Sequence, residues 1–497
     1  MLPSIPRPED YDVSPYLGFL PAELPLEVLP NPYYSKWETI AKNLQGLILS
    51  RRLRGVVDRL PILSTDHLQS EPEWRRANSL LGFMVHAYVW GGDRPAEVVP
   101  PPLSIPFLAT CKHLELPPVA TYAGVALWNY KPLFDDEPID NLDNLATLLT
   151  FTGSLDESWF YLISVAIEAR AGPIVPLMLS AMQAARDNDA RIVTACLQSF
   201  AERLDELATI LSRMYENCDP HVFYHRIRPF LAGSKNMADA GLPRGVIFDT
   251  DGTATAEPVQ YSGGSNAQSS IIQFFDLVLG VEHRPTGQKS SSTPAAAATG
   301  PPPPSHNFIH EMRRYMPGQH RHFLEHVASV ANIQEFVMER RSDKSLSTAY
   351  DACLAMLRNF RDKHVQLVSR YIIVKSRETR RESMSGSNST SPPPNVKRLN
   401  IANASSSSPS TGEDAKKNLK GTGGTALIPF LKQARDETGE PAIGSWARRL
   451  LTSAGAKGGL GFAPLGALNE QSNGLSEIVG LSGIWTDNGE TGGICHW

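Results

Sequence analysis

The residue with the clearest chemical potential in this chain is His364, near the middle of an amphipathic stretch from Ser345 to Val374. Apolar residues recur there at three- and four-residue steps, which predicts a helix with His364 on its buried face. Thr348, followed by Asp351, is the expected helix start. Such a histidine is either a core residue satisfied by a neighbour or a neutral imidazole that ligates a haem iron. In the second case Arg361, one turn earlier, would pair with a haem propionate or a buried acid.

Three further positions place a polar side chain among apolar neighbours. Arg228 lies beside the aromatic face of a short predicted helix, so it is either an ordinary ion-paired residue or a group that binds a ligand. Ser164 faces the apolar side of a predicted helix at 155–171. A later apolar helix contains one acid, Asp276, which invites an arginine partner.

Metal and dinucleotide sites find little support in the spacing of residues. His322 and His326 are four residues apart on a predicted helix, but no third ligand accompanies them. His67, His86 and His113 have no mutual spacing typical of a metal site, so each is expected to be structural. The GGSNAQ turn lacks the GxGxxG spacing of a dinucleotide site.

The composition excludes several classes of protein. The 497 residues carry a formal charge of -5, and the sequence pI is near 6.2, which argues against a nucleic-acid binder or a polybasic membrane protein. The five cysteines contain no CxxC pair, so we expect reduced thiols in a cytosolic setting. We expect no signal peptide, because the N-terminal residues include prolines and acids, and no uninterrupted apolar span of about twenty residues. A cytoplasmic protein with small-molecule partners is therefore expected.

The helical periodicity predicts an all-α protein that positions these residues. We expect a smaller helical N-terminal domain at 1–120, a larger helical haem-binding domain at 121–440, and a glycine-rich extension of unknown role at 441–497. Low-complexity insertions are expected at about 283–306 and 376–418. Individual helices are predicted at 37–60, 76–90, 155–171, 187–217, 219–231 and 270–280, and the proline-dense VVPPPLSIPF is expected to exclude helix.

The wording of several segments resembles one known family. AYDACLAMLRNFRDKHVQLVSRYIIV resembles the proximal-histidine helix of the indoleamine 2,3-dioxygenases, and MRRYMPGQHRHFLEHV and GGSNAQSSIIQFFDLVLG resemble upstream segments of that family in the same order. The resemblance extends back to residues 29–37 and forward to KGTGGT at 420–425, which is roughly four-fifths of the chain.

The resemblance implies a haem b cofactor, one per chain and active as Fe(II), with His364 as the proximal iron ligand. It implies a second-shell ion pair of Arg361 and Asp276 that reaches toward a haem propionate, and it places Ser265 near the cofactor. It implies catalytic roles for Ser164, Phe223 and Arg228. It assigns to the substrate pocket Tyr122, Val125, Phe160, Ser164, Phe223, Arg228, Gly264, Ser265 and Asn266, with Thr422 as a residue of a mobile lid.

The implied reaction inserts both atoms of dioxygen across the indole C2–C3 bond of L-tryptophan and related indoleamines, giving N-formylkynurenine, the first step of the kynurenine route towards NAD. Ser164 stands where the tryptophan 2,3-dioxygenases carry a distal histidine. Asn266 stands where better-known members of the family carry alanine, which could narrow the pocket or add a hydrogen bond to the substrate.

Other partners follow from the same resemblance. Dioxygen is the co-substrate, an unidentified electron donor keeps the iron ferrous, and the chain is expected to act as a monomer without nucleic acid or membrane. The alternatives are a haem-binding gas sensor or low-activity relative without efficient tryptophan turnover, and a helical scaffold without haem.

Overall fold

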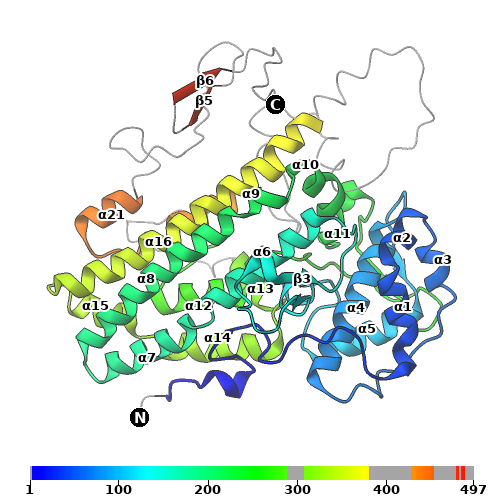
Figure 1. Cartoon of the computed structure of the whole chain (residues 1–497), viewed down its shortest axis with the longest axis horizontal. Coiled ribbons are helices and arrows are strands. Elements are labelled where there is room, and N and C mark those ends of the chain that lie inside the picture. Colours follow the sequence, from blue (N-terminus) through cyan, green and yellow to red (C-terminus); the bar gives the residue numbers. More distant parts are fainter. Residues whose placement is uncertain (1–2, 288–306, 380–426, 453–476, 481–482, 487–497) are drawn as a thin grey trace, which may run out of the picture. The chain divides into compact units, whose positions relative to one another are not determined.

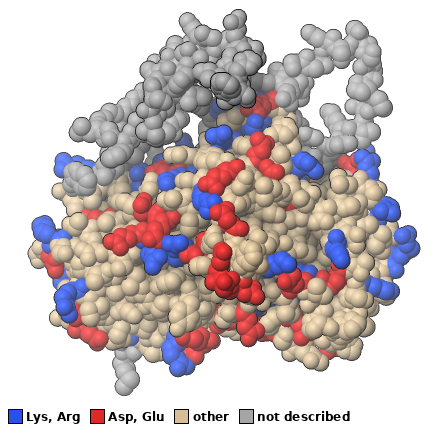
Figure 2. All heavy atoms as spheres, viewed as in Figure 1, with Lys and Arg blue, Asp and Glu red and all other residues tan. Residues whose placement is uncertain are grey.

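Helices carry nearly all of the regular structure in the computed structural model of the chain, which describes residues 3–287, 307–379, 427–452, 477–480 and 483–486. In these residues the strands form only two-stranded pairs. The all-α prediction is therefore confirmed. Figure 2 shows acidic and basic side chains interspersed over the face that it draws.

Four helices near the N-terminus, α1, α2, α3 and α5, gather around the long, buried helix α4 (Figure 1). The single helix predicted at 37–60 is wrong in detail, because Arg51 adopts a left-handed conformation (φ 57°) that ends one helix before the next begins. These helices are α1 (Ser35–Lys42), α2 (Leu44–Leu49), α3 (Leu53–Val57), α4 (Glu71–Trp90) and α5 (Pro101–His113).

Helix α5 contradicts the expectation that the proline-dense segment excludes helix. Pro101 and Pro102 occupy its first turn, where backbone N–H groups have no partner within the helix, so the missing donors cost nothing there. Only Pro106 lies inside the helix, and the helix continues past it to His113.

The two longest helices, α8 (Ala190–Ser212) and α16 (Lys344–Val368), run side by side (Figure 1). The predicted helix start at Thr348 is wrong, because Asp343 caps α16 by accepting hydrogen bonds from the backbone N–H groups of Ser345 and Leu346. The thiol of Cys353 donates to a backbone carbonyl of α8, which ties the two helices together.

Helix α6 (Leu155–Ala171) has the predicted bounds, and α7 (Ile174–Arg186) follows it directly. Together they form a run of 32 residues whose most apolar 18-residue window has a mean hydropathy of 1.6, enough to cross a membrane by length and composition alone. The run is interrupted by charged residues such as Glu168 and Arg170. Since 72% of its most apolar window is buried inside the protein, its hydropathy is accounted for by the core.

The remaining elements are shorter. Parallel strands β1 (Val98–Val99) and β4 (Ile247–Phe248) pair with each other, as do antiparallel strands β2 (Tyr130–Pro132) and β3 (Leu145–Thr147). The other α-helices described up to residue 452 are α9 (Met214–Asn217), α10 (Pro220–Val222), α11 (Arg228–Leu231), α12 (Ser270–Leu279), α13 (Phe308–Arg313), α14 (Gly318–Val330), α15 (Ile333–Glu339), α20 (Leu427–Glu437) and α21 (Ser445–Thr452). Five 3-10 turns are η1 (Pro8–Tyr11), η2 (Pro32–Tyr34), η4 (Leu142–Asn144), η6 (Ala238–Ala240) and η7 (Asn266–Gln268).

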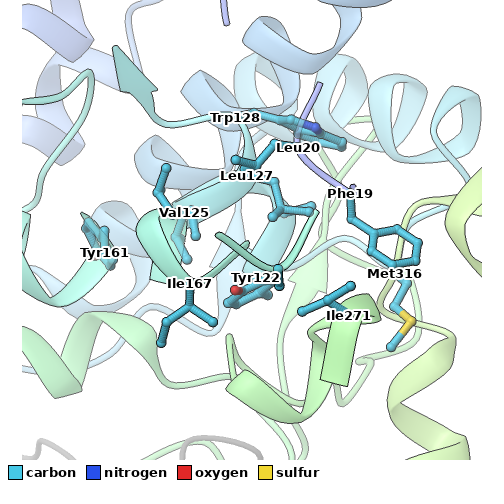
Figure 3. Close-up of a cluster of buried hydrophobic side chains, with 14 of the residues drawn as sticks. Phe19, Leu20, Tyr122, Val125, Leu127, Trp128, Tyr161, Ile167, Ile271 and Met316 are labelled. Atoms are coloured by element: carbon cyan, nitrogen blue, oxygen red, sulfur yellow. The ribbon is translucent and has the colours of Figure 1, made fainter. Parts of the chain in front are cut away.

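Contacts divide the chain into one unit of residues 1–452 and a second of residues 453–497. In the first unit, Phe19 and Leu20 of the N-terminal segment lie in the same apolar cluster as Tyr122 and Met316 (Figure 3). In the second, β5 (Glu477–Gly480) and β6 (Gly483–Thr486) pair antiparallel. The predicted domain boundaries at residues 120 and 440 stay predictions.

The structure corrects the edges of both predicted low-complexity insertions. His283 and Arg284, assigned to the first insertion, are packed and ion-paired. Residues 376–379, assigned to the second, continue a helix. Residues 288–306 and 380–418 lie outside the described part of the chain.

Candidate functional site

The first unit contains a cavity that brings most of the predicted site residues together. Its empty volume is about 1210 Å³, including space open to solvent, and it adjoins a second of about 930 Å³ with which it shares His364, Ser164 and Tyr122. The cavity is lined by ten predicted residues, which are Tyr122, Val125, Phe160, Ser164, Phe223, Arg228, Gly264, Ser265, Asn266 and His364. Asp276 and Arg361 line the adjoining volume, and Thr422 lies outside the described residues.

Helix α16 directs His364 into the cavity. The side chain is half-buried and lines both adjoining volumes. Burial, with a smaller contribution from the charge of Arg361, lowers the pKa of His364 to about 4. The imidazole is therefore neutral at neutral pH, the form that ligates a metal.

One turn before His364, Arg361 forms the predicted ion pair with Asp276 of α12. Its Nη2 lies 2.8 and 2.7 Å from the two carboxylate oxygens, and its Nη1 donates to the hydroxyl of Thr438. Burial alone would raise the pKa of Asp276, but Arg361 and His283 outweigh it and hold that pKa below its ordinary value. Asp276 is thus a buried carboxylate kept ionised by two basic side chains.

Arg228 is completely buried and lines the cavity from the first residue of α11. The segment that carries it begins at Asp219, whose carboxylate caps α10 by accepting from the N–H groups of His221 and Val222. The guanidinium carbon lies 5.3 Å from the centre of the Tyr224 ring. Burial lowers the pKa of Arg228, but an arginine stays charged at neutral pH. The cavity wall therefore carries a fixed positive charge.

Aromatic rings form another part of the wall. The centroids of Phe160 and Phe223 are 4.8 Å apart with an interplanar angle of 48°, and Phe223 meets Tyr371 edge to face at 5.7 Å. Such tilted and edge-on arrangements are those that aromatic rings prefer. The wall therefore offers ring faces and edges against which a flat aromatic ligand can pack.

Three π-helical turns surround the cavity, and the sequence analysis missed all of them. They are η3 (Ala123–Leu127), η5 (Phe223–Ile227) and η8 (Ser369–Val374). Each contributes lining side chains, among them Val125, Phe223 and Tyr371. A π turn inserts one residue into the helical repeat and is frequent at functional sites. Here the three turns change the direction of side chains that an α-helical repeat would place elsewhere.

A buried acid behind the cavity wall was also missed. Glu168 of α6 accepts hydrogen bonds from the phenol of Tyr122 (2.9 Å) and the hydroxyl of Ser269 (2.8 Å). Burial raises the pKa of Glu168 to about 7, although these two donors lower it. The signal in the sequence was an acid four residues after Ser164 in an otherwise apolar run. Glu168 fixes Tyr122, which lies among the core side chains of Figure 3.

We expect Glu168→Gln to change how stability depends on pH. The folded protein holds a proton on Glu168 up to about pH 7, whereas the unfolded chain releases it near pH 4.5. The free energy of unfolding of the wild type should therefore fall between these pH values, by about 3 kcal/mol from this group. Urea unfolding at pH 4.5 and 7.5 should show this loss in the wild type but not in E168Q.

The control is Glu202→Gln, an exposed residue of α8. E202Q should retain the wild-type loss of stability between the two pH values, because it leaves Glu168 and its hydrogen-bond partners unchanged. If the free energy of unfolding depended on pH equally in wild type and E168Q, the pKa of Glu168 would not be raised in the folded protein.

The other histidines behave as structural residues. Buried His86 lies 2.7 Å through Nδ1 from the carbonyl of Phe230 and accepts through Nε2 from the N–H of Ala120, and burial lowers its pKa to about 4. His326 pairs with the hydroxyl of Tyr11. Among the described residues, no group of three or more His, Cys, Asp or Glu side chains could hold a metal ion.

This geometry defines a helical protein with one neutral imidazole and one buried guanidinium on the wall of a shared apolar cavity. Residues 7–441 match the family model described as indoleamine 2,3-dioxygenase. Indoleamine 2,3-dioxygenase of Saccharomyces cerevisiae is 40% identical over 444 residues, covering 87% of this chain and 93% of that protein.

More distant relatives also match over most of their length. 6-Hydroxytryptophan 2,3-dioxygenase of Fusarium equiseti is 36% identical, covering 86% of this chain and 96% of that protein. Indoleamine 2,3-dioxygenase 1 of Rattus norvegicus is 32% identical, covering 88% of this chain and 96% of that protein. The chain belongs to the indoleamine 2,3-dioxygenase family and is a dioxygenase, an oxidoreductase.

Proposed function

We propose that the protein is a haem-dependent dioxygenase that inserts both atoms of dioxygen across the indole C2–C3 bond of L-tryptophan to give N-formylkynurenine, the first step of the kynurenine route towards NAD. The observation that carries this proposal is the shared cavity, in which a neutral His364 and a buried Arg228 line one space together with aromatic rings. A flat amino acid with a carboxylate matches that combination of charge and shape.

The residues of the cavity fit a haem. A histidine must be neutral to ligate a haem iron, and His364 is neutral at neutral pH. The two adjoining volumes share His364, Ser164 and Tyr122 in their walls, so a cofactor held by His364 would lie next to the proposed substrate pocket. Arg361, anchored by Asp276, supplies a cation for a propionate from the wall of the smaller volume, and Ser265 lines the larger volume together with His364. The bound haem would supply the iron that activates dioxygen.

The chain's own side chains would bind and orient the substrate. Arg228 would donate two parallel hydrogen bonds to the substrate carboxylate, a geometry that a lysine cannot reproduce. Phe160 and Phe223 would pack against the indole ring. Ser164 offers only a hydroxyl at its position and no ionisable base, so substrate orientation rests on the arginine and the aromatic wall.

The remaining substrate contacts are proposals of the same kind. Tyr122, Val125, Gly264 and Asn266 line the cavity and would set the shape of the pocket, with Asn266 as a hydrogen-bonding group toward the indole or the amino acid. The relative from Fusarium equiseti is named for a ring-hydroxylated tryptophan. The side-chain amide of Asn266 can hydrogen-bond to a hydroxyl group on the indole ring. We therefore extend the proposed substrate class to ring-hydroxylated indoles.

The measurement that tests the function is the absorption spectrum of the purified, reduced protein, with and without L-tryptophan, followed in air. We expect a Soret band and accumulation of N-formylkynurenine. A Soret band without product would identify a haem sensor or a relative that has lost turnover. A colourless, fully folded preparation from cells with ample haem would return His364 to a structural role.

A further inference from the structure

The ion pair beside His364 is part of a larger buried network that reaches the C-terminal helix α20. The imidazole of His283 lies between two carboxylates, with Nε2 3.1 Å from Asp276 and Nδ1 2.7 Å from Glu437. The side chains of His283 and both acids are at most 6% exposed. Asp276 belongs to α12, and Glu437 is the last residue of α20. One imidazole therefore links the two helices inside the protein.

Each of the two buried carboxylates faces His283 and an arginine, because Arg361 lies 2.7 Å from Asp276 and the Nε of Arg284 lies 3.6 Å from Glu437. Asp276 and Glu437 carry negative charges, whereas Arg361 and a protonated His283 carry positive charges. Burial alone would lower the pKa of His283, but the two carboxylates outweigh it and raise that pKa. The pKa of Glu437 is correspondingly held below its ordinary value, despite burial, by His283 and Gln433. Removal of one member would leave a buried charge uncompensated.

The same contacts tie the chain after α12 to α20. Glu437 accepts a hydrogen bond from the backbone N–H of Arg284 (3.1 Å), and Gln433 donates to the carbonyls of Arg284 and Pro285. The guanidinium of Arg284 also pairs with Glu440 just after the helix, but this pair is partly exposed to solvent. Solvent-exposed ion pairs contribute little to stability. We therefore expect the buried His283–Glu437 pair to hold α20 in place.

Helix α20 in turn forms part of the cavity wall. Phe430 and Leu431 line both adjoining volumes, and Leu427 lines the larger one. Phe430 also meets Phe308 of α13 edge to face at 4.7 Å. Displacement of α20 would open the cavity to water on the side that carries Arg361.

We propose that His283 and Glu437 are positioning residues that fasten α20 over the cavity and thereby retain the haem. This inference rests on the proposed function, because it concerns the haem that His364 would bind. Neither residue touches the proposed substrate pocket; both act through the position of α20 and through Asp276.

Two conservative variants of the full chain, His283→Gln and Glu437→Gln, test this proposal. The matched control is Glu440→Gln, which makes the same change in the partly exposed pair of Glu440 with Arg284. The first readout is the rate of haem transfer from each protein to excess apomyoglobin. The second is hydrogen exchange of the α20 amides in the haem-free full chain, which does not depend on cofactor or activity.

We expect H283Q and E437Q to accelerate both haem loss and α20 exchange about tenfold or more, as for other residues that orient ligand-holding groups. In E440Q the rates of haem loss and of α20 exchange should both stay within about twofold of the wild-type rates. The double variant H283Q/E437Q should resemble the single variants, because the coupling is already lost in each. Haem loss and exchange in E437Q no faster than in E440Q would overturn the proposal.

The two proposals fail in different ways. If the wild type binds no haem, the proposed function fails, while exchange in α20 still decides whether His283 and Glu437 fasten the helix. If the wild type binds haem and forms product but E437Q retains haem like E440Q, the function stands and the fastening role is wrong.

Discussion

Arg228→Ala is expected to raise the Michaelis constant for L-tryptophan strongly while the protein still binds haem. The guanidinium is fully buried on the cavity wall, so a substrate carboxylate would meet it with little competition from water. Loss of such a charged hydrogen-bonded pair costs about 2–5 kcal/mol, and we expect kcat/KM to fall about 100-fold or more. Steady-state kinetics on haem-loaded R228A, with the Soret band as a measure of loading, give the result.

Two further variants separate charge from geometry. Arg226→Ala removes an arginine two residues away that is exposed, so it should leave the kinetics unchanged. Arg228→Lys keeps the charge but cannot make two parallel hydrogen bonds, so its kcat/KM should fall between those of wild type and R228A. Unchanged tryptophan kinetics in R228A would remove Arg228 from the proposed substrate clamp.

Local patterns predicted the elements that hold most of the site. The apolar repeat of α6 predicted its bounds, because periodicity and the Ser154 cap both act within a few residues. The same reasoning placed His364 on an inward face and expected an arginine partner for Asp276. The family resemblance added the assignment of lining residues such as Phe160, which spacing alone does not mark as part of a pocket.

The sequence could not show pairs that form between distant segments. Glu437 follows His283 by 154 positions, and no local rule connects an acid in a C-terminal helix with a histidine beside a low-complexity stretch. Glu168 was hidden for a similar reason, since its partner Tyr122 lies on another element. The π turns escaped because a one-residue insertion leaves the hydrophobic pattern nearly helical. All three features depend on packing, and all lie beside the cavity.

His364→Ala should abolish haem binding, and with it all activity, without unfolding the protein. The ring projects into an open cavity, so its removal leaves little of the void that makes core truncations costly. Haem content from the Soret band, together with thermal unfolding of the haem-free chain, measures the two effects. Added imidazole should restore a Soret band in H364A, because a free imidazole fits the space left by the side chain and supplies the missing iron ligand.

His320→Ala provides the matched comparison, because His320 is another buried imidazole whose pKa burial lowers, to about 3, but it lies on α14 with its ring 5.0 Å from that of Phe19. H320A should keep its haem and lose about 2–4 kcal/mol of stability, since it leaves a cavity in packed core. If H364A instead kept haem and lost stability like H320A, His364 would be a core histidine. The opposite outcomes of the two variants would show that the neutral imidazole of His364 is there to bind a cofactor, whereas that of His320 is there to fill the core.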